Sequence, residues 1–161
     1  MTVVSTNPDT DALTLTMVSD LAAPPERVWE LWSDPRQLER WWGPPTYPAT
    51  FERHDFVVDG DSRYFMTGPD GDKSRGWFKF VAIDEPRSIE FDEGFADTSG
   101  EPSDKMPTSR MRVELAAGGA GTRMTVTTRF ANAEDMKMLV EMGMAEGMAE
   151  AMNQIDAILA G

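Results

Sequence analysis

The sequence predicts an α+β fold in which a curved antiparallel sheet of seven strands surrounds one long C-terminal helix, with two short helices near the N-terminus. Two observations carry this prediction. The middle of the chain alternates apolar and polar residues in short segments separated by turn residues, and the end repeats apolar residues with helical spacing. A sheet with one solvated face must bury the other, and the C-terminal helix has an apolar stripe wide enough to cover it.

The N-terminal region divides into a polar tail and a first strand. Residues 1–10 are polar and contain Asn7-Pro8-Asp9, so we expect a flexible tail. Apolar and polar residues alternate over 12–19, which predicts the first strand. We therefore expect residues 11–161 to form one domain, which is long enough to bury a core without a disulfide or a metal.

Two short helices are predicted after this strand. Pro25 lies in the first turn of one helix, and Val28, Leu31 and Trp32 follow at the spacing that places them on one apolar face. Asp34 begins the second helix as an N-cap, with a proline at the next position. The pattern therefore predicts that both helices bury one side.

The second short helix ends at two adjacent tryptophans, Trp41 and Trp42, followed by Gly43-Pro44. Adjacent helical residues point about 100° apart, so the two rings cannot share one narrow stripe. Gly and Pro stop the helix and turn the chain. The pair thus predicts a large aromatic surface at the point where the chain turns. This surface either closes a core or caps the mouth of a cavity.

Six more strands are predicted in the middle of the chain, over the ranges 50–58, 62–67, 75–83, 88–95, 108–115 and 122–130. Turn residues separate them, as at Asp59-Gly60 and Asp84-Glu85-Pro86. The segment 97–107 is polar and carries Gly100 and Pro102, which predicts a long loop that is either a lid or disordered.

The C-terminal segment predicts one long helix that begins after Asn132, a good N-cap residue. Its apolar stripe consists of Val140, Met144, Met148, Met152, Ile155 and Leu159. Gly143 and Gly147 border the stripe, and each costs about 1 kcal/mol of helix stability relative to Ala. Their presence indicates either a close approach of another segment or a soft point in the helix.

Composition excludes several classes of function. The formal net charge is −13, which opposes binding to duplex nucleic acid or to anionic lipid surfaces. The chain has no Cys and a single His, so we expect no disulfide, no metal site and no cofactor. We find no apolar run long enough for a membrane span and no signal-like start, so a cytoplasmic location is expected.

Several motifs together resemble the START-like superfamily, also called SRPBCC or birch-pollen-allergen-like, over residues 12–160. The closest resemblance is to the branch of the heat-shock-protein-90 ATPase activator homologues. The motifs are Ala23–Trp29, Trp32–Pro35, Leu38–Pro44, Gly68–Gly71, Arg75-Gly76, Ile83–Ile89 and Gly121–Val126. The final helix departs from the branch, because Met144 and Met148 stand where tryptophans are usual. Methionine makes a softer and more adaptable wall than tryptophan.

The resemblance implies a helix-grip fold with a cavity between the sheet and the long helix. It implies as the leading function the binding of a hydrophobic or amphipathic small molecule. The residues that we expect to line the cavity are Trp41, Trp42, His54, Phe65, Phe78, Phe80, Phe91, Met111, Val113, Met144 and Met148.

Two other functions remain open at the sequence level. A cyclase or hydrolase would need a polar pair in the cavity, and His54 with Glu52 is the best candidate because both fall on one face of the predicted strand. A co-chaperone-like role, or a homodimer, would use a sheet edge or the methionine-rich helix, where Met138 and Met142 lie outside the apolar stripe.

Overall fold

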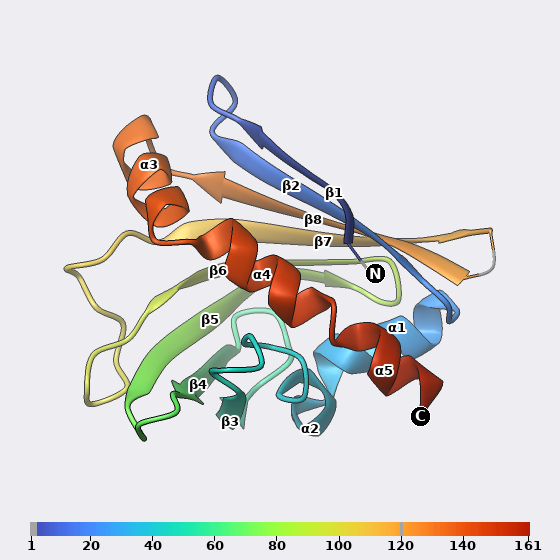
Figure 1. Ribbon diagram of the computed structural model, residues 1–161, viewed down its shortest axis with the longest axis horizontal. Coiled ribbons are helices and arrows are strands. Elements are labelled where there is room, and N and C mark those ends of the chain that lie inside the picture. Colours follow the sequence, from blue (N-terminus) through green and yellow to red (C-terminus); the bar gives the residue numbers. More distant parts are fainter. Residues whose placement is uncertain (1–2, 120) are drawn as a thin grey trace.

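The computed structural model of the protein describes residues 3–119 and 121–161. Within these residues, one antiparallel sheet of eight strands in the order β1-β2-β8-β7-β6-β5-β4-β3 curves around the C-terminal helices (Figure 1). The predicted α+β fold with a large antiparallel sheet is thereby confirmed. The strands are β1 (Val3–Asp9), β2 (Thr14–Leu21), β3 (Ala49–His54), β4 (Asp61–Thr67), β5 (Lys73–Asp84), β6 (Ser88–Phe95), β7 (Ser109–Gly118) and β8 (Gly121–Phe130).

Strand β1 forms in the segment for which the sequence predicted a flexible tail. The sheet therefore has eight strands and not the seven that were predicted. It pairs antiparallel with β2, from Asp9 opposite Thr14 to Val3 opposite Ser19. The Asp9 carboxylate accepts hydrogen bonds from the backbone N–H groups of Asp11 and Ala12, both at 3.0 Å, and so closes the hairpin. An edge strand tolerates polar residues and proline, which explains why its composition resembles that of a tail.

The sheet has an inner face, covered by the helices, and an outer face. Side chains alternate between the two faces along each strand. Phe80 on β5, Phe91 on β6 and Met111 on β7 are direct partners in the ladder, and all three are at most 2% exposed. This row marks the centre of the core on the inner face.

Two helices and the turn that follows them, Trp41–Pro44, close one end of this core. Helix α1 (Pro25–Ser33) is followed by α2 (Pro35–Leu38), and the Asp34 side chain caps α2 by accepting from Arg36 N at 2.9 Å. We call the turn Trp41–Pro44 the corner after α2. Trp41 is fully buried and donates its indole N–H to the Leu31 carbonyl at 3.0 Å. The tryptophan pair therefore closes the core, which is one of the two roles that the sequence predicted for it.

The predicted long C-terminal helix is instead three helices in succession, α3 (Ala133–Glu141), α4 (Met144–Met152) and α5 (Ile155–Ala160). The first break occurs at Gly143, whose φ of +90° is left-handed. At the second break the Gln154 side-chain amide donates to the carbonyls of Gly43 at 2.8 Å and Trp41 at 3.3 Å. The breaks let the helices bend along the sheet (Figure 1). No helix in the described ranges is long and apolar enough to cross a membrane.

The two glycines of the C-terminal segment should respond oppositely to alanine. Gly143→Ala should lower the free energy of unfolding by about 1 kcal/mol, because a side chain is strained in the left-handed region. Gly147→Ala should raise it by about 0.5–1 kcal/mol, since a Cβ at this position in α4 meets nothing within 4 Å. Urea unfolding of both variants measures the difference. A stabilising Gly143→Ala would contradict the break and indicate one continuous helix.

Candidate functional site

Most residues predicted to line the cavity pack against one another instead of surrounding open space. Ring centroids are 4.5 Å apart for Phe78 and Phe91, and 5.1 Å apart for Trp42 and Phe78. Seven of the predicted lining residues are at most 3% exposed, namely Trp41, Trp42, Phe78, Phe80, Phe91, Met111 and Val113. The middle of the inner face is therefore a closed aromatic core, while Met148 packs at its border and is partly exposed.

Phe65 lies on the outer face, and its neighbour Tyr64 takes the inner position. The Lys73 Nζ atom sits 4.4 Å from the centroid of the Phe65 ring, and the Arg75 guanidinium sits 5.3 Å from it. The Tyr64 ring instead stacks on Phe51 at 4.9 Å. The inner-facing positions of β4 are therefore one residue out of phase with the prediction from the sequence, and Phe65 does not line the inner face.

His54 is held as a structural side chain by both of its ring nitrogens. Its Nε2 donates to the Trp32 carbonyl at 2.9 Å, because a carbonyl only accepts, and its Nδ1 then accepts from the Ser62 hydroxyl at 2.7 Å. Burial lowers the pKa of His54 below its ordinary value. This neutral and fully engaged ring has no nitrogen left for a ligand or for proton transfer.

Glu52, the predicted partner of His54, lies on the other side of the sheet. An irregularity in the pairing of β3 with β4 between Phe51 and Arg53 shifts the alternation of β3 by one residue. The Glu52 carboxylate therefore pairs with Arg75 on the outer face, where Glu52 Oε1 lies 3.1 Å from Arg75 Nη1. The predicted polar pair does not assemble.

The structure places a different polar group in a pocket at one end of the inner face. This pocket has a volume of about 90 Å³ and lies between the sheet and the junction of α3 and α4. Strands β4, β6 and β7 supply its polar groups, and α3, α4 and the segment before β7 supply apolar walls. Its lining residues are Tyr64, Glu93, Gly94, Phe95, Pro107, Ser109, Leu139 and Met144.

Glu93 is the only charged residue among those that line this pocket. It follows Ile89 and Phe91 in the inner-facing phase of β6, directly between Phe78 on β5 and Ser109 on β7. The Ser109 hydroxyl donates to Glu93 Oε1 at 3.2 Å. Burial raises the pKa of Glu93 to about 7, and the Ser109 hydrogen bond only partly opposes this rise. Both protonation states are therefore populated near neutral pH.

Tyr64 brings a second polar group to the same pocket. Burial raises the pKa of its hydroxyl above the ordinary value, and the nearby Glu93 charge raises this pKa further. The Trp42 indole N–H lowers the same pKa, but by less. That indole nitrogen is buried and makes no hydrogen bond of standard geometry to any residue that the structure describes. Gly76 is opposite Tyr64 in the ladder, and a Cβ there would collide with the Tyr64 hydroxyl. The glycine thus leaves room for the tyrosine on the inner face.

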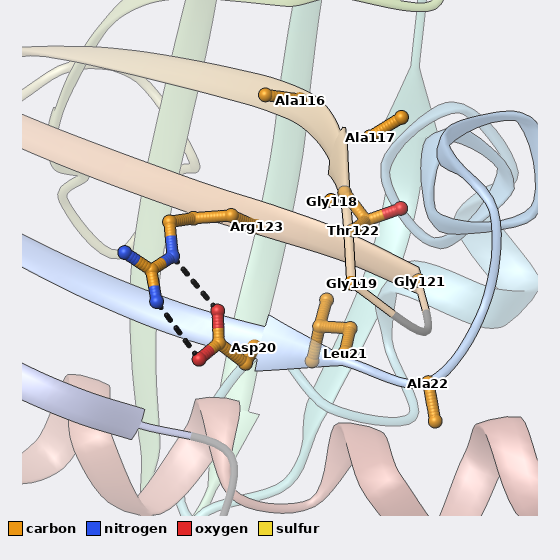
Figure 2. A pocket seen from close by; sticks show the side chains of 10 residues that line it. All are labelled: Asp20, Leu21, Ala22, Ala116, Ala117, Gly118, Gly119, Gly121, Thr122 and Arg123. Carbon is orange, nitrogen blue, oxygen red and sulfur yellow. Dashed lines mark hydrogen bonds and ion pairs between the residues drawn. The ribbon is translucent and has the colours of Figure 1, made fainter.

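A larger hollow lies at the other end of the sheet, where β2 ends beside the hairpin of β7 and β8. Figure 2 shows its small lining side chains and the ion pair of Arg123 with Asp20, whose atoms are 2.8 and 3.0 Å apart. Its volume is about 530 Å³, but both charged groups are exposed and already paired. In the described ranges, no group of three or more His, Asp or Glu residues could hold a metal ion. The Glu93 pocket is therefore the better candidate site.

Glu93 should make stability depend on pH. Its folded-state pKa of about 7 lies above the ordinary 4.5, so the folded state binds more protons and stability falls as pH rises between these values. The loss from this one group should reach up to about 3 kcal/mol. Chemical unfolding from pH 4 to pH 8 should show that Glu93→Gln removes this loss. The control Glu90→Gln, on the outer face of β6 beside Arg112, should retain it.

A Glu93→Gln variant whose unfolding free energy runs parallel to that of the unmodified protein over this pH range would contradict the burial of the carboxyl group.

Comparison with known proteins places the chain in a family. The model described as "Activator of Hsp90 ATPase homolog 1-like protein" matches residues 22–160. A protein from Arthrobacter aurescens, known from solution NMR, is 52% identical with a TM-score of 0.95, covering 99% of this chain and 92% of that one. A Mycobacterium smegmatis protein is 44% identical with a TM-score of 0.90, covering 98% and 96%. No significant match is found among curated proteins.

More distant structures share the fold alone. A protein from Silicibacter pomeroyi is 21% identical with a TM-score of 0.73, and the match covers 91% of this chain and 97% of that chain. The family match spans the region from the end of β2 to the end of α5, which includes every residue that lines the Glu93 pocket. The protein therefore belongs to the Activator of Hsp90 ATPase homolog 1-like family.

Proposed function

We propose that the protein binds a hydrophobic or amphipathic small molecule in the Glu93 pocket. The observation that carries the proposal is a carboxyl group on the inner face of the sheet with one hydrogen bond, beside walls that are otherwise mainly apolar. Burying such a group disfavours its charged form, and perturbed acids inside clefts cluster at functional sites.

The walls of the pocket are suited to a change of shape. Leu139 comes from α3, Met144 from α4 and Pro107 from the segment before β7, so three separate parts of the chain meet over the pocket. The left-handed Gly143 separates α3 from α4, directly beside Met144. Methionine adapts to irregular ligands because its side chain is unbranched and flexible. We therefore expect the Met144 side chain to move and widen the opening when a ligand binds.

The aromatic core limits how deep a ligand lies. Trp42 and Phe78 are at most 3% exposed and pack against each other on the inner face next to Tyr64. A ligand at Glu93 would therefore occupy the end of the inner face between Phe95 and Met144, and not its centre. Catalysis by His54 gains no support, since both ring nitrogens are engaged and Glu52 lies on the opposite face.

Toluene, a small apolar probe, tests the proposal when the methionine methyl groups carry ¹³C labels. The Met144 methyl signal should shift saturably, with a dissociation constant on the order of 1 mM. Met138 and Met142 provide internal controls, because they are 42% and 56% exposed and should not shift.

A blocked variant completes the test. Met144→Trp should fill the pocket and abolish saturable binding, whereas Met142→Trp, which adds the same ring at an exposed position, should leave it unchanged. Shifts confined to the exposed methionines, or no saturation at Met144, would contradict a ligand pocket at this end of the sheet.

A further inference from the structure

The Glu93 pocket differs in its charge balance from the rest of strand β6. On the outer face, Asp92 pairs with Arg110 at 2.7 Å and Glu90 lies 3.9 Å from Arg112. On the inner face, Glu93 has no ion pair within the described residues, and no Lys, Arg or His lines its pocket. The carboxyl group is thus the one acid of this strand that the protein itself does not balance.

The polar atoms around Glu93 form an acceptor set. The carboxylate only accepts, and Ser109 spends its hydroxyl hydrogen on Glu93 Oε1, which leaves the serine lone pairs available. The Tyr64 hydroxyl adds a third oxygen at the pocket wall. A protonated amino group offers three donors and no acceptor, which complements three oxygens of this kind.

The remaining walls fit a hydrocarbon body. Phe95, Pro107, Leu139 and Met144 present apolar surface on the side away from the strand oxygens. The formal charge of −13 also favours the approach of cations over that of carboxylates. We propose that the pocket selects apolar amines, whose ammonium group binds Glu93, Ser109 and Tyr64 while the hydrocarbon lies against Leu139 and Met144. This inference rests on the proposed function, because it names the ligand class of the same pocket.

Four probes with one benzene ring test the selection by titration of the Met144 methyl signal at pH 8. Benzylamine is positively charged, benzyl alcohol and toluene are neutral, and benzoate is negatively charged. Benzylamine should bind at least about tenfold more tightly than benzyl alcohol, as expected for a charge-assisted hydrogen bond in a partly dry site. Benzoate should bind more weakly than toluene, because it meets a like charge.

The variants locate the effect. Glu93→Gln should bring benzylamine to the affinity of benzyl alcohol and leave toluene unchanged, while the outer-face control Glu90→Gln should bind as the unmodified protein does. If Glu93→Gln does not fold, Ser109→Ala serves instead and should weaken benzylamine several-fold with no effect on toluene. Benzylamine should also bind more weakly at pH 6 than at pH 8, because Glu93 is largely protonated at pH 6.

No other ionisable group at the pocket competes with this pH effect. Tyr64 on β4 is the only other titratable lining residue and stays neutral between pH 6 and pH 8, because its pKa is raised. Ser109 on β7, Pro107 before it, Leu139 on α3 and Met144 on α4 do not titrate in this range.

The outcomes separate the two proposals. Equal binding of benzylamine, benzyl alcohol and toluene at Met144 would overturn the amine selection while supporting a small-molecule pocket. Benzylamine binding that survives Glu93→Gln would also overturn it, because attraction by the overall charge would then suffice. No saturable shift at Met144 with any of the four probes would overturn both proposals.

Discussion

Aromatic packing between the corner after α2 and the inner face of the sheet fills the centre of the core. Trp32 lies 4.8 Å from Trp41, and Trp42 lies 5.1 Å from Phe78, measured between ring centroids. The Gln154 amide then ties the break between α4 and α5 to this corner. Because these rings fill the centre of the inner face, the proposed ligand would lie beyond them, at the end of the sheet where Glu93 lies.

A site at this position has an energetic cost. Near neutral pH the fold holds a carboxyl group whose charged form is disfavoured by burial, and Ser109 is the one hydrogen-bond donor to it among the described residues. Residues that reduce stability and line a pocket are typical of functional sites, because activity needs an environment that is not optimal for folding. The neutral and fully bonded His54 shows the opposite case, in which a titratable side chain stabilises the core.

Local patterns predicted much of the fold, and long-range or single-residue events account for the rest. Alternation located β2 to β8 but not the edge strand β1, and the cap at Asp34 was visible in the sequence. The irregularity in β3 places His54 and Glu52 on opposite faces of the sheet, and no composition signal reveals a shift of one residue. The apolar stripe of the C-terminal segment continues past Gly143 without interruption, so the sequence gives no sign of a left-handed break there. Glu93 was missed for a different reason. Its alternation with Ile89 and Phe91 indicates the inner face of β6, but a single acidic residue in a strand is more typical of a solvated face.

Glu93 lies in a mainly apolar pocket in which no described residue supplies a balancing charge. The most direct measurement is the titration of its side-chain ¹³C carboxyl resonance by NMR, with the signal assigned by its loss in Glu93→Gln. We expect a midpoint near pH 7, because burial dominates over the hydrogen bond from Ser109. A midpoint near the ordinary 4.5 would show that the carboxylate is well solvated and not buried in the pocket.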